Sequence, residues 1–363
     1  MGKLVTFGEI MGRMAAPGHL RLRQAMPGQL EVTFAGAEAS VAAGFVQLGG
    51  TASFITALPK NPIADACIDT LRALGVDTSR VLRTDAGRVG LYFLETGANQ
   101  RPSQVTYDRE GSAICITSAE SYPWRESFQG AGWLHVSGIT PAISPLAAGA
   151  VLAAVQEARA QGMKVSCDLN FRSKLWRWDP PLNPRQLAER TMRGILPLVD
   201  VVIANEEDAG DVLSIRAKDT DVHAGRIASA RYSEVAAEIV RQFPQVRTVG
   251  ITLRESISAT HNNWGAMLYD TASGQSYFAP LQEGRYEPYA ITSIVDRLGA
   301  GDAFAAGLIF ALTTPELAAP QTAVSFAAAA SCLAHSIAGD FCLVNRAEVE
   351  ALMKSRGAGR VVR

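Results

Sequence analysis

The sequence predicts an α/β fold in which a central, mostly parallel sheet lies between two layers of helices and carries a small β-sheet lid. Short apolar runs alternate along the chain with longer segments that repeat apolar residues every three or four positions. Two further segments, 11–34 and 88–116, alternate apolar and polar residues instead. Because no repeat or long linker divides the chain, residues 1–363 are predicted to form a single domain.

The buried elements follow from these two patterns. The apolar runs predict strands at 3–7, 52–57, 133–137, 164–168, 199–204 and 248–253, and the three-to-four residue period predicts helices at 39–48, 63–74, 147–161 and 232–243. Alternating strands and helices of this kind build a parallel sheet that is covered on both faces.

The two segments at 11–34 and 88–116 are predicted to form the lid. Their alternation, as in Gly-Leu-Tyr-Phe-Leu-Glu at 90–95, is typical of half-exposed antiparallel strands. A lid of this kind excludes water from a reaction. An ordinary exposed hairpin is the alternative.

Composition excludes several classes of function. The chain has 34 Lys and Arg against 35 Asp and Glu, so it lacks the positive charge of a nucleic-acid-binding or membrane-surface protein. Five scattered cysteines without a Cys-x-x-Cys pair, and five histidines away from metal-ligand spacings, support neither a disulfide framework nor a zinc site. We expect no membrane span, and a cytoplasmic location.

The stretch Gly-Ala-Gly-Asp at 299–302 precedes an uninterrupted helical run. Small residues at a helix N-terminus let its free N–H groups and dipole approach an anion such as a phosphoryl group. Asp302 is then placed to take a proton from an attacking hydroxyl. The alternative is an aspartate that merely caps a helix after a glycine turn.

This stretch resembles the C-terminal signature of the ribokinase-like (pfkB-type) carbohydrate kinases, Asp-Thr-x-Gly-Ala-Gly-Asp-x-Phe. Asp296 and the residues 299–304 match, while Arg297-Leu298 departs from the pattern. The resemblance implies that the amides of Gly299, Ala300 and Gly301 form an anion hole and that Asp302 is the catalytic base. It also implies ATP, Mg²⁺ and a monovalent cation, whose site lies close to the departure at Arg297.

Two other stretches extend the resemblance over nearly the whole chain. Residues 34–50 are similar to the N-terminal signature that opens a helix against the sugar, with Ser40 in place of the usual Asn. Asn205-Glu-Glu-Asp208 follows an apolar strand as the family's Asn-x-x-Glu does, with Asp in place of Glu, which implies Mg²⁺ and phosphate near Asn205 and Asp208. A solvated helix start is the alternative for these acids.

Finer matches point to one substrate class within the family. The stretches 107–109, 168–176, 252–256, 295–297 and 339–341 are similar to 2-keto-3-deoxygluconate kinases. The resemblance implies substrate contacts from Gly36, Ala37, Glu38, Ser40, Tyr92, Tyr107, Arg109, Arg172 and Asp340, and nucleotide contacts from Asn170, Asn205, Asp208, Thr252, Arg254 and Ser256.

The residue types fit an acid sugar. An arginine fork binds a carboxylate through two parallel hydrogen bonds, and tyrosine packs on a sugar while offering its hydroxyl. Each arginine has an alternative explanation: Arg109 as a surface residue of the lid, and Arg172 as the ion-pair partner of Asp168.

The sequence therefore predicts an ATP-dependent kinase of 2-keto-3-deoxygluconate, acting on its terminal hydroxyl. The family often pairs lid strands between subunits, which implies a homodimer, with the sugar acid and ATP as the small-molecule partners. The alternatives are a kinase of another sugar, such as fructose, ribose or 2-keto-3-deoxygalactonate, and a catalytically silent sugar-binding relative.

Overall fold

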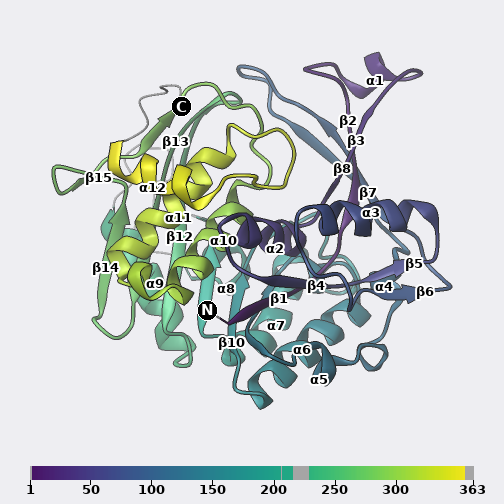
Figure 1. Cartoon of the computed structure of the whole chain (residues 1–363), viewed down its shortest axis with the longest axis horizontal. Coiled ribbons are helices and arrows are strands. Elements are labelled where there is room, and N and C mark those ends of the chain that lie inside the picture. The colour runs from purple at the N-terminus through teal and green to yellow at the C-terminus, as the bar shows by residue number, and fades with distance from the viewer. Residues whose placement is uncertain (1, 206, 216–228, 356–363) are drawn as a thin grey trace.

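A sheet of nine strands runs through the computed structural model, and helices cover both of its faces (Figure 1). The structure describes residues 2–205, 207–215 and 229–355, without the side chains of 229, 230 and 355. The strands are β1 (Lys3–Phe7), β4 (Ala52–Ile55), β9 (Ala131–Ser137), β10 (Lys164–Asp168), β11 (Val201–Ala204), β12 (Thr248–Ser258), β13 (His261–Asp270), β14 (Gln275–Ala279) and β17 (Tyr289–Ile291). They lie in the order β14-β13-β12-β11-β10-β9-β1-β4, with β17 beside β13.

Six neighbouring strands of this sheet are parallel, namely β4, β1, β9, β10, β11 and β12. Strands β13, β14 and β17 extend the sheet through antiparallel pairs. This confirms the mostly parallel sheet predicted from the sequence. One predicted strand is divided: β4 ends at Ile55, and β5 (Ala57–Pro59) instead pairs with β6 (Leu82–Thr84) in a separate small sheet. Periodicity missed this break because the residues on both sides of it are buried.

Alternate residues of each strand pack into different cores. Leu4 packs into one hydrophobic cluster and its neighbour Val5 into another, and Val201 and Val202 divide in the same way. Since successive side chains of a strand point to opposite faces, the two clusters mark the two faces of the sheet. The chain therefore forms the predicted three-layer α/β/α sandwich.

The helices divide between the two faces. One cluster includes residues of α2 (Ala37–Gln47), α3 (Pro62–Ala73), α10 (Ala300–Thr313), α11 (Pro320–Ala334) and α12 (Arg346–Ser355). The other includes residues of α4 (Ala113–Ile116), α5 (Trp124–Ser127), α6 (Pro145–Ala160), α7 (Pro184–Ile195), α8 (Asp208–Leu213) and α9 (Ser229–Gln242). The four predicted helices correspond to α2, α3, α6 and α9.

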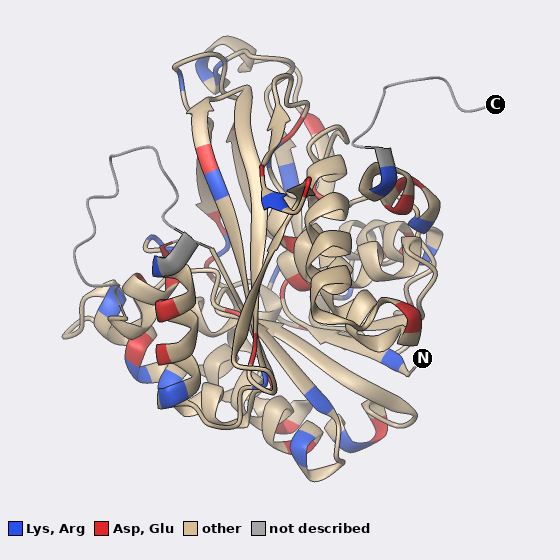
Figure 2. Cartoon of the chain, turned by 90° about the vertical axis from the view of Figure 1, so that its left-hand side faces the viewer, with Lys and Arg blue, Asp and Glu red and all other residues tan. Residues whose placement is uncertain are grey.

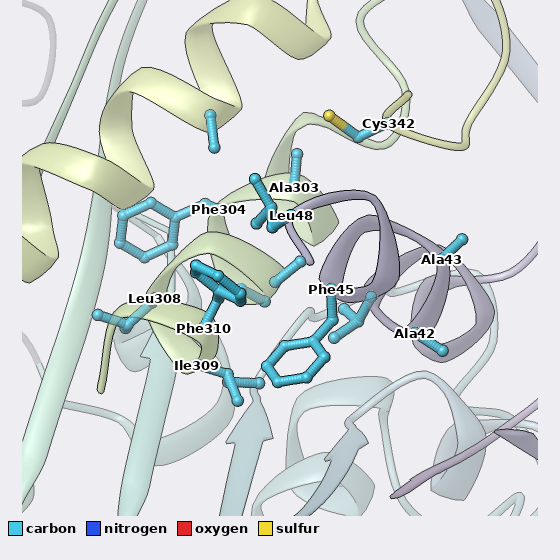
Figure 3. Packing of buried hydrophobic residues seen from close by; sticks show 14 of the residues in the cluster. Ala42, Ala43, Phe45, Leu48, Ala303, Phe304, Leu308, Ile309, Phe310 and Cys342 are labelled. Carbon is cyan, nitrogen blue, oxygen red and sulfur yellow. The ribbon is translucent and has the colours of Figure 1, made fainter. Parts of the chain in front are cut away.

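Helices α2 and α10 pack directly against each other (Figure 3). The rings of Phe45 and Phe310 meet edge to face, with centroids 5.7 Å apart. A Cβ on Gly44 would lie only 3.1 Å from the Cβ of Ala306, so the glycine lets the two helix backbones come close. This packing fixes the N-termini of α2 and α10 relative to each other, and both termini line the cavity described below.

The lid is a separate four-stranded sheet that projects from the body of the molecule (Figure 1). It consists of β2 (Met11–Ala15), β3 (Glu31–Ala35), β7 (Gly90–Glu95) and β8 (Gln104–Asp108), in the order β3-β2-β7-β8, and α1 (Leu22–Ala25) lies between β2 and β3 in the chain. The outer pairs are antiparallel, as expected, but the central pair of β2 and β7 is parallel. The sequence pattern does not distinguish the two, because alternation depends on exposure and not on strand direction.

Charged residues of both signs are interspersed along the chain in the view of Figure 2, in agreement with the net charge of −1. No helix in the described part of the chain is long and apolar enough to span a membrane.

Candidate active site

A cavity of about 270 Å³ lies between the lid and the carboxyl ends of the central strands. Its wall includes Asp168, the last residue of β10, and Ala204, the last residue of β11. This edge is where α/β proteins with open sheets bind their ligands. Sixteen of the predicted site residues line it: Gly36, Ala37, Tyr92, Tyr107, Arg109, Asn170, Arg172, Asn205, Asp208, Thr252, Arg254, Gly299, Ala300, Gly301, Asp302 and Asp340.

The N-terminus of α10 opens into this cavity. Gly299 precedes the helix with φ near +80°, and a Cβ at this position would lie 2.3 Å from the main-chain oxygen of Asp340, so only glycine fits. The first hydrogen bond of the helix runs from the N–H of Ala303 to the oxygen of Gly299, at 2.8 Å. The amides of Ala300, Gly301 and Asp302 precede that bond, and Gly301 is exposed. An anion in the cavity can therefore approach unpaired N–H groups and the positive end of the helix dipole.

Asp302 lies in the first turn of α10 and is half-buried. Burial raises the pKa of its carboxyl group well above the ordinary value, and the negative charges of Asp168 and Asp340 raise it further, while Arg172 lowers it. A carboxylate with a raised pKa binds a proton more strongly than an ordinary aspartate does. The geometry and the raised pKa both suit a general base.

Asp168 and Asp208 lie on the floor of the cavity. Burial raises the pKa of Asp168 to about 8, with a further contribution from the charge of Asp208. Asp208 accepts hydrogen bonds from the N–H groups of Phe171, at 3.1 Å, and Asn205, at 3.0 Å, one on each carboxylate oxygen. It therefore ties together the loops that follow β10 and β11. Burial raises its pKa as well.

These acids bear on how a divalent cation could bind. Among the described residues, no three His, Cys, Asp or Glu side chains are grouped so that they could hold a metal ion. The raised pKa values of Asp168 and Asp208 nevertheless show that burial disfavours their ionised forms, which a nearby cation would stabilise. Mg²⁺ takes oxygen ligands and is commonly held by one or two carboxylates together with phosphate groups and water. The residues present fit a Mg²⁺ ion that arrives with a nucleotide.

On the lid side, Arg109 forms a buried ion pair with Glu9. Its Nε donates a hydrogen bond to Glu9 Oε2 at 2.6 Å, and the two side chains are only 6% and 3% exposed. The guanidinium also lies 5.5 Å from the centre of the Tyr107 ring. Arg109 is therefore a buried residue of the cavity wall and not a surface residue of the lid. Sequence reasoning missed Glu9, although a carboxylate two residues after the first strand was a signal that could have indicated it.

Tyr92 and Asp340 lie together in the same wall. The hydroxyl of Tyr92 lies 2.9 Å from both carboxylate oxygens of Asp340. Burial raises the pKa of Asp340, whereas the neighbouring Arg13 lowers it. The lid thus contacts the segment that follows α11.

Arg172 differs from Arg109 in being exposed. Its Nη1 donates to the main-chain oxygen of Phe171 at 3.2 Å, and within the described chain it forms no ion pair with Asp168. Its charge still lowers the pKa of Asp168 and of Asp302. The guanidinium remains able to bind an anionic ligand.

The opposite end of the cavity is built from β12, β13 and the segments before α10 and after α11. Thr252 and Arg254 lie two residues apart on β12 and line this end. Asn262, Trp264 and His335, which sequence reasoning missed, also line it, and the rings of Trp264 and His335 meet edge to face at 4.8 Å. In the sequence, the rings of Trp264 and His335 look like ordinary core residues, so nothing indicated that they line a cavity.

Arg297, where the sequence departs from the family pattern, lies in the same region. It donates hydrogen bonds to the oxygen of Ser258, at 3.1 Å, and to Asn262 Oδ1, at 2.9 Å. Burial lowers its pKa, and so does the nearby charge of Arg254. This end of the cavity is therefore locally positive.

The family model described as "pfkB family carbohydrate kinase" matches residues 1–343 of the chain. This chain is a pfkB family carbohydrate kinase. The family match confirms the resemblance that the motifs at 34–50, 205–208 and 296–304 indicated.

Three proteins that are similar to this pfkB family kinase are 2-dehydro-3-deoxygalactonokinases or 2-dehydro-3-deoxygluconokinases. A 2-dehydro-3-deoxygalactonokinase from Haloferax volcanii is 30% identical over 357 residues, which cover 98% of each chain. A 2-dehydro-3-deoxygluconokinase from Bacillus subtilis is 35% identical over 175 residues, 47% of this chain and 52% of that protein. The crystal structure of a 2-dehydro-3-deoxygluconokinase from Thermotoga maritima superposes with a TM-score of 0.87 at 42% identity, covering 98% of this chain and 100% of that one.

Three predicted site residues of this carbohydrate kinase do not line the cavity. Glu38 is fully buried, and its Oε1 accepts hydrogen bonds from Ser137, at 2.7 Å, and Thr140, at 2.8 Å. Ser40 is 2% exposed in the packed first half of α2. Ser256 is exposed on β12 and donates to Asn262 Oδ1 at 3.4 Å. Their positions correct the prediction: Glu38 and Ser40 are enclosed by core packing, and Ser256 lies beyond the cavity wall.

Proposed function

We propose that this kinase transfers the γ-phosphoryl group of Mg²⁺-ATP to the terminal hydroxyl of 2-keto-3-deoxygluconate, giving 2-keto-3-deoxy-6-phosphogluconate and ADP. The observation that supports a sugar acid as the substrate is the pair of guanidinium groups, Arg109 and Arg172, in a cavity that also contains Asp302. An arginine fork matches the carboxylate of a sugar acid. Arg172 would offer this carboxylate an exposed cation, and Arg109 would share its guanidinium between the sugar acid and Glu9.

The lid side of the cavity would hold the sugar acid. Tyr92, Tyr107 and Arg109 come from β7, β8 and the segment after β8, and Gly36 and Ala37 lie at the N-terminus of α2. A Cβ on Gly36 would lie 2.1 Å from the main-chain oxygen of Glu9, so the wall is tightly packed at this point. Asp340, held by Tyr92, would accept hydrogen bonds from sugar hydroxyl groups.

The sheet side would hold the nucleotide. Asn170, Asn205 and Asp208 follow β10 and β11, and Thr252 and Arg254 lie on β12. When bound, Mg²⁺ would supply positive charge against the phosphate oxygens, close to Asn205 and Asp208. Arg254 and Arg297 make this end favourable for an anionic nucleotide.

In the reaction, the oxygen of the sugar hydroxyl forms a bond to the γ-phosphorus as the bond to the ADP oxygen breaks. Asp302 accepts the proton of the hydroxyl. The amides of Ala300 and Gly301, at the positive end of α10, stabilise the charge on the transferring group. The lid covers the cavity and excludes water, which would otherwise compete as the phosphoryl acceptor.

A second substrate is favoured by a specific finding. The relative that matches over 98% of both chains is a 2-dehydro-3-deoxygalactonokinase, whose sugar carries the same carboxylate and keto group. Arg109 and Arg172 would serve either sugar equally. Only contacts with the hydroxyl groups would distinguish the two.

A panel of substrates tests the proposal. ADP release should be measured with 2-keto-3-deoxygluconate, 2-keto-3-deoxygalactonate, fructose and ribose, each with Mg²⁺-ATP, with and without added K⁺. We expect the highest kcat/KM with 2-keto-3-deoxygluconate and values at least about tenfold lower with the neutral sugars. A preference for fructose or ribose would contradict the proposal, and binding without ADP release on any sugar would favour a silent sugar-binding protein.

We also propose a homodimer that forms through the lid. The outer strands β3 and β8 are mostly exposed, and Val32 on β3 is 59% exposed. Such an edge can pair with a second copy of itself. Light scattering should give the mass of a dimer for the native protein and that of a monomer for Val32→Glu, and a native monomer would contradict this proposal.

A further inference from the structure

Arg13 on strand β2 is a buried cation with two carboxylate partners. Its side chain is only 8% exposed and forms ion pairs with Asp296 and Asp340. Asp296 lies in the segment before α10, and Asp340 in the segment after α11. One residue of the lid therefore bridges two segments of the main body. Arg13 does not itself line the cavity.

The register of the lid sheet places Arg13 beside cavity residues. Arg13 is paired with Tyr92 across β2 and β7, and Tyr92 is paired with Tyr107 across β7 and β8. Residues directly opposite each other in a sheet point to the same face. Arg13 and Tyr92 both bind the carboxylate of Asp340, so two adjacent lid strands hold this one side chain.

The two carboxylates in turn position the N-terminus of α10. Asp296 accepts hydrogen bonds from the N–H groups of Leu298, at 3.1 Å, and Gly339, at 3.2 Å, so it links the segments before α10 and after α11. The main-chain oxygen of Asp340 lies so close to Gly299 that no Cβ fits between them. The position of Gly299, and hence of the amides that follow it, depends on how Asp296 and Asp340 are held.

A hydrophobic contact runs parallel to the ion pairs. Leu298, the residue before Gly299, packs against the lid cluster of Met11, Ala15, Ala35, Tyr92 and Leu94. The lid thus contacts the α10 segment through both apolar and charged groups. Without Arg13, Asp296 and Asp340 would be two largely buried carboxylates that face each other with no cation between them, and they would repel each other.

We propose that Arg13 is a positioning residue for phosphoryl transfer: acting through Asp296 and Asp340, it holds the N-terminus of α10 in its reactive position while the lid covers the cavity. This inference rests on the sugar kinase activity of the family and does not depend on which sugar the protein prefers. Misplacing a reactive group by about 1 Å can cost about a hundredfold in rate, so the effect should be large in kcat.

The first experiment compares kcat and KM of Arg13→Met and Arg88→Met, with the substrate of the panel above that gives the highest kcat/KM. Arg88 precedes β7 and forms an ion pair with Asp108, but 37% of its side chain is exposed and it does not line the cavity, so it serves as the control. We expect Arg13→Met to lower kcat by about a hundredfold while the KM for ATP stays within about threefold. Arg88→Met should keep both values within about threefold. Because all variants use one substrate, an error in the proposed sugar would affect them alike.

The second experiment asks whether Arg13 acts through Asp296. If it does, Arg13→Met and Asp296→Asn should not be additive, and the double variant should be no slower than the slower single variant by more than about threefold. Losses in kcat that multiply would overturn the proposal. A normal kcat in Arg13→Met with a lowered Tm would also overturn it, since Arg13 would then be only structural.

Arg13→Lys keeps the test decisive if Arg13→Met fails to fold. Lysine retains the charge but lacks the planar fork that reaches two carboxylates, so kcat should fall at least about tenfold with a Tm close to that of the native protein. Added guanidinium ion at low millimolar concentration should partly restore kcat in Arg13→Ala and leave Arg88→Ala unchanged. Full activity of Arg13→Lys, or no response of Arg13→Ala to guanidinium, would count against the proposal.

Discussion

The two sides of the cavity handle charge in opposite ways. On the lid side, each buried arginine has carboxylate partners: Arg109 pairs with Glu9, and Arg13 with Asp296 and Asp340. On the sheet side, the pKa values of Asp168, Asp208 and Asp302 are all raised by burial, and the cation that offsets them, Arg172, is exposed.

The difference indicates which kind of ligand each side of the cavity is suited to bind. Paired charges on the lid side fix side chains before any ligand binds, so that a sugar meets a preformed wall. The clustered acids of the sheet side carry a cost in the free protein that a bound cation would relieve. The lid side is therefore built for recognition, and the sheet side for a cation and for proton transfer.

The largest expected effect comes from removing the base on the sheet side. Asp302→Asn should lower kcat by at least about a hundredfold with little change in the KM for the sugar, because the amide fills the same space but cannot accept the proton. In the native protein, kcat should fall as the pH is lowered through the raised pKa of Asp302, at a higher pH than for an ordinary aspartate. Steady-state kinetics across pH check both expectations.

Glu38→Gln is the matched control for this variant. Glu38 is a buried acid whose charge raises the pKa of Asp302, yet it does not line the cavity. We expect its kcat to stay within about tenfold of the native value. Near-normal turnover in Asp302→Asn, or an equal loss in both variants, would remove Asp302 from the role of base.

A smaller effect is expected on the lid side, which we propose discriminates between acid and neutral sugars. Replacing Arg109 alone would leave Glu9 as an unpaired buried charge, and misfolding would obscure the result. The double variant Glu9→Gln/Arg109→Gln removes the pair without an orphan charge. Its kcat/KM should fall by about a hundredfold for 2-keto-3-deoxygluconate, because the guanidinium contact with the carboxylate is lost, and by less than about threefold for fructose.

Glu9→Gln alone is the control for the double variant. It keeps the guanidinium and should retain the preference for the acid sugar, since Arg109 then has no competing carboxylate. Equal losses for acid and neutral sugars in the double variant would show that Arg109 does not select the carboxylate. Competition assays with both sugars in one reaction measure the ratio directly.

How far the sequence could predict this molecule follows from what each pattern encodes. Strand-helix alternation predicted the three layers because burial on both faces leaves continuous apolar runs such as Val-Val-Ile-Ala at 201–204. The motif at 299–302 located the N-terminus of α10, because only glycine tolerates the backbone conformation at Gly299 and its close contact with Asp340. Local chemistry of this kind is visible in one stretch of sequence.

What the sequence could not predict depends on contacts between distant residues. Arg13 and Asp340 are 327 positions apart, and nothing near either residue indicates that they meet. Glu38 lies within a recognisable motif, but its burial depends on Ser137 and Thr140 from another part of the fold. Motif residues predicted the location of the cavity, and only packing determines which of their side chains reach it.

The smallest expected effect is on the stability of the free protein, to which the buried acids of the sheet side contribute. The carboxyl group of Asp168 has an ordinary pKa of 3.8 when unfolded and one of about 8 when folded. Between these values the folded state binds more protons than the unfolded state, so stability falls as the pH rises from about 4 to about 8. Asp168→Asn removes this term and should raise the free energy of unfolding at pH 8 by on the order of 2 kcal/mol, with little change at pH 4.

Asp77→Asn gives the opposite sign and serves as the control. Partial burial is the largest single effect and raises the pKa of Asp77, but Lys3 and Ser79 together outweigh it and lower this pKa to about 2. Its contribution is therefore present above the unfolded pKa and is lost as the pH falls towards 2, so the variant should be less stable at pH 7 by under about 1 kcal/mol. Urea unfolding of Asp168→Asn at pH 4 and pH 8, and of Asp77→Asn at pH 3 and pH 7, measures the two slopes. If Asp168→Asn is no more stable than the native protein at pH 8, the acids of the sheet side are already compensated in the free protein, and the contrast between the two sides of the cavity does not hold.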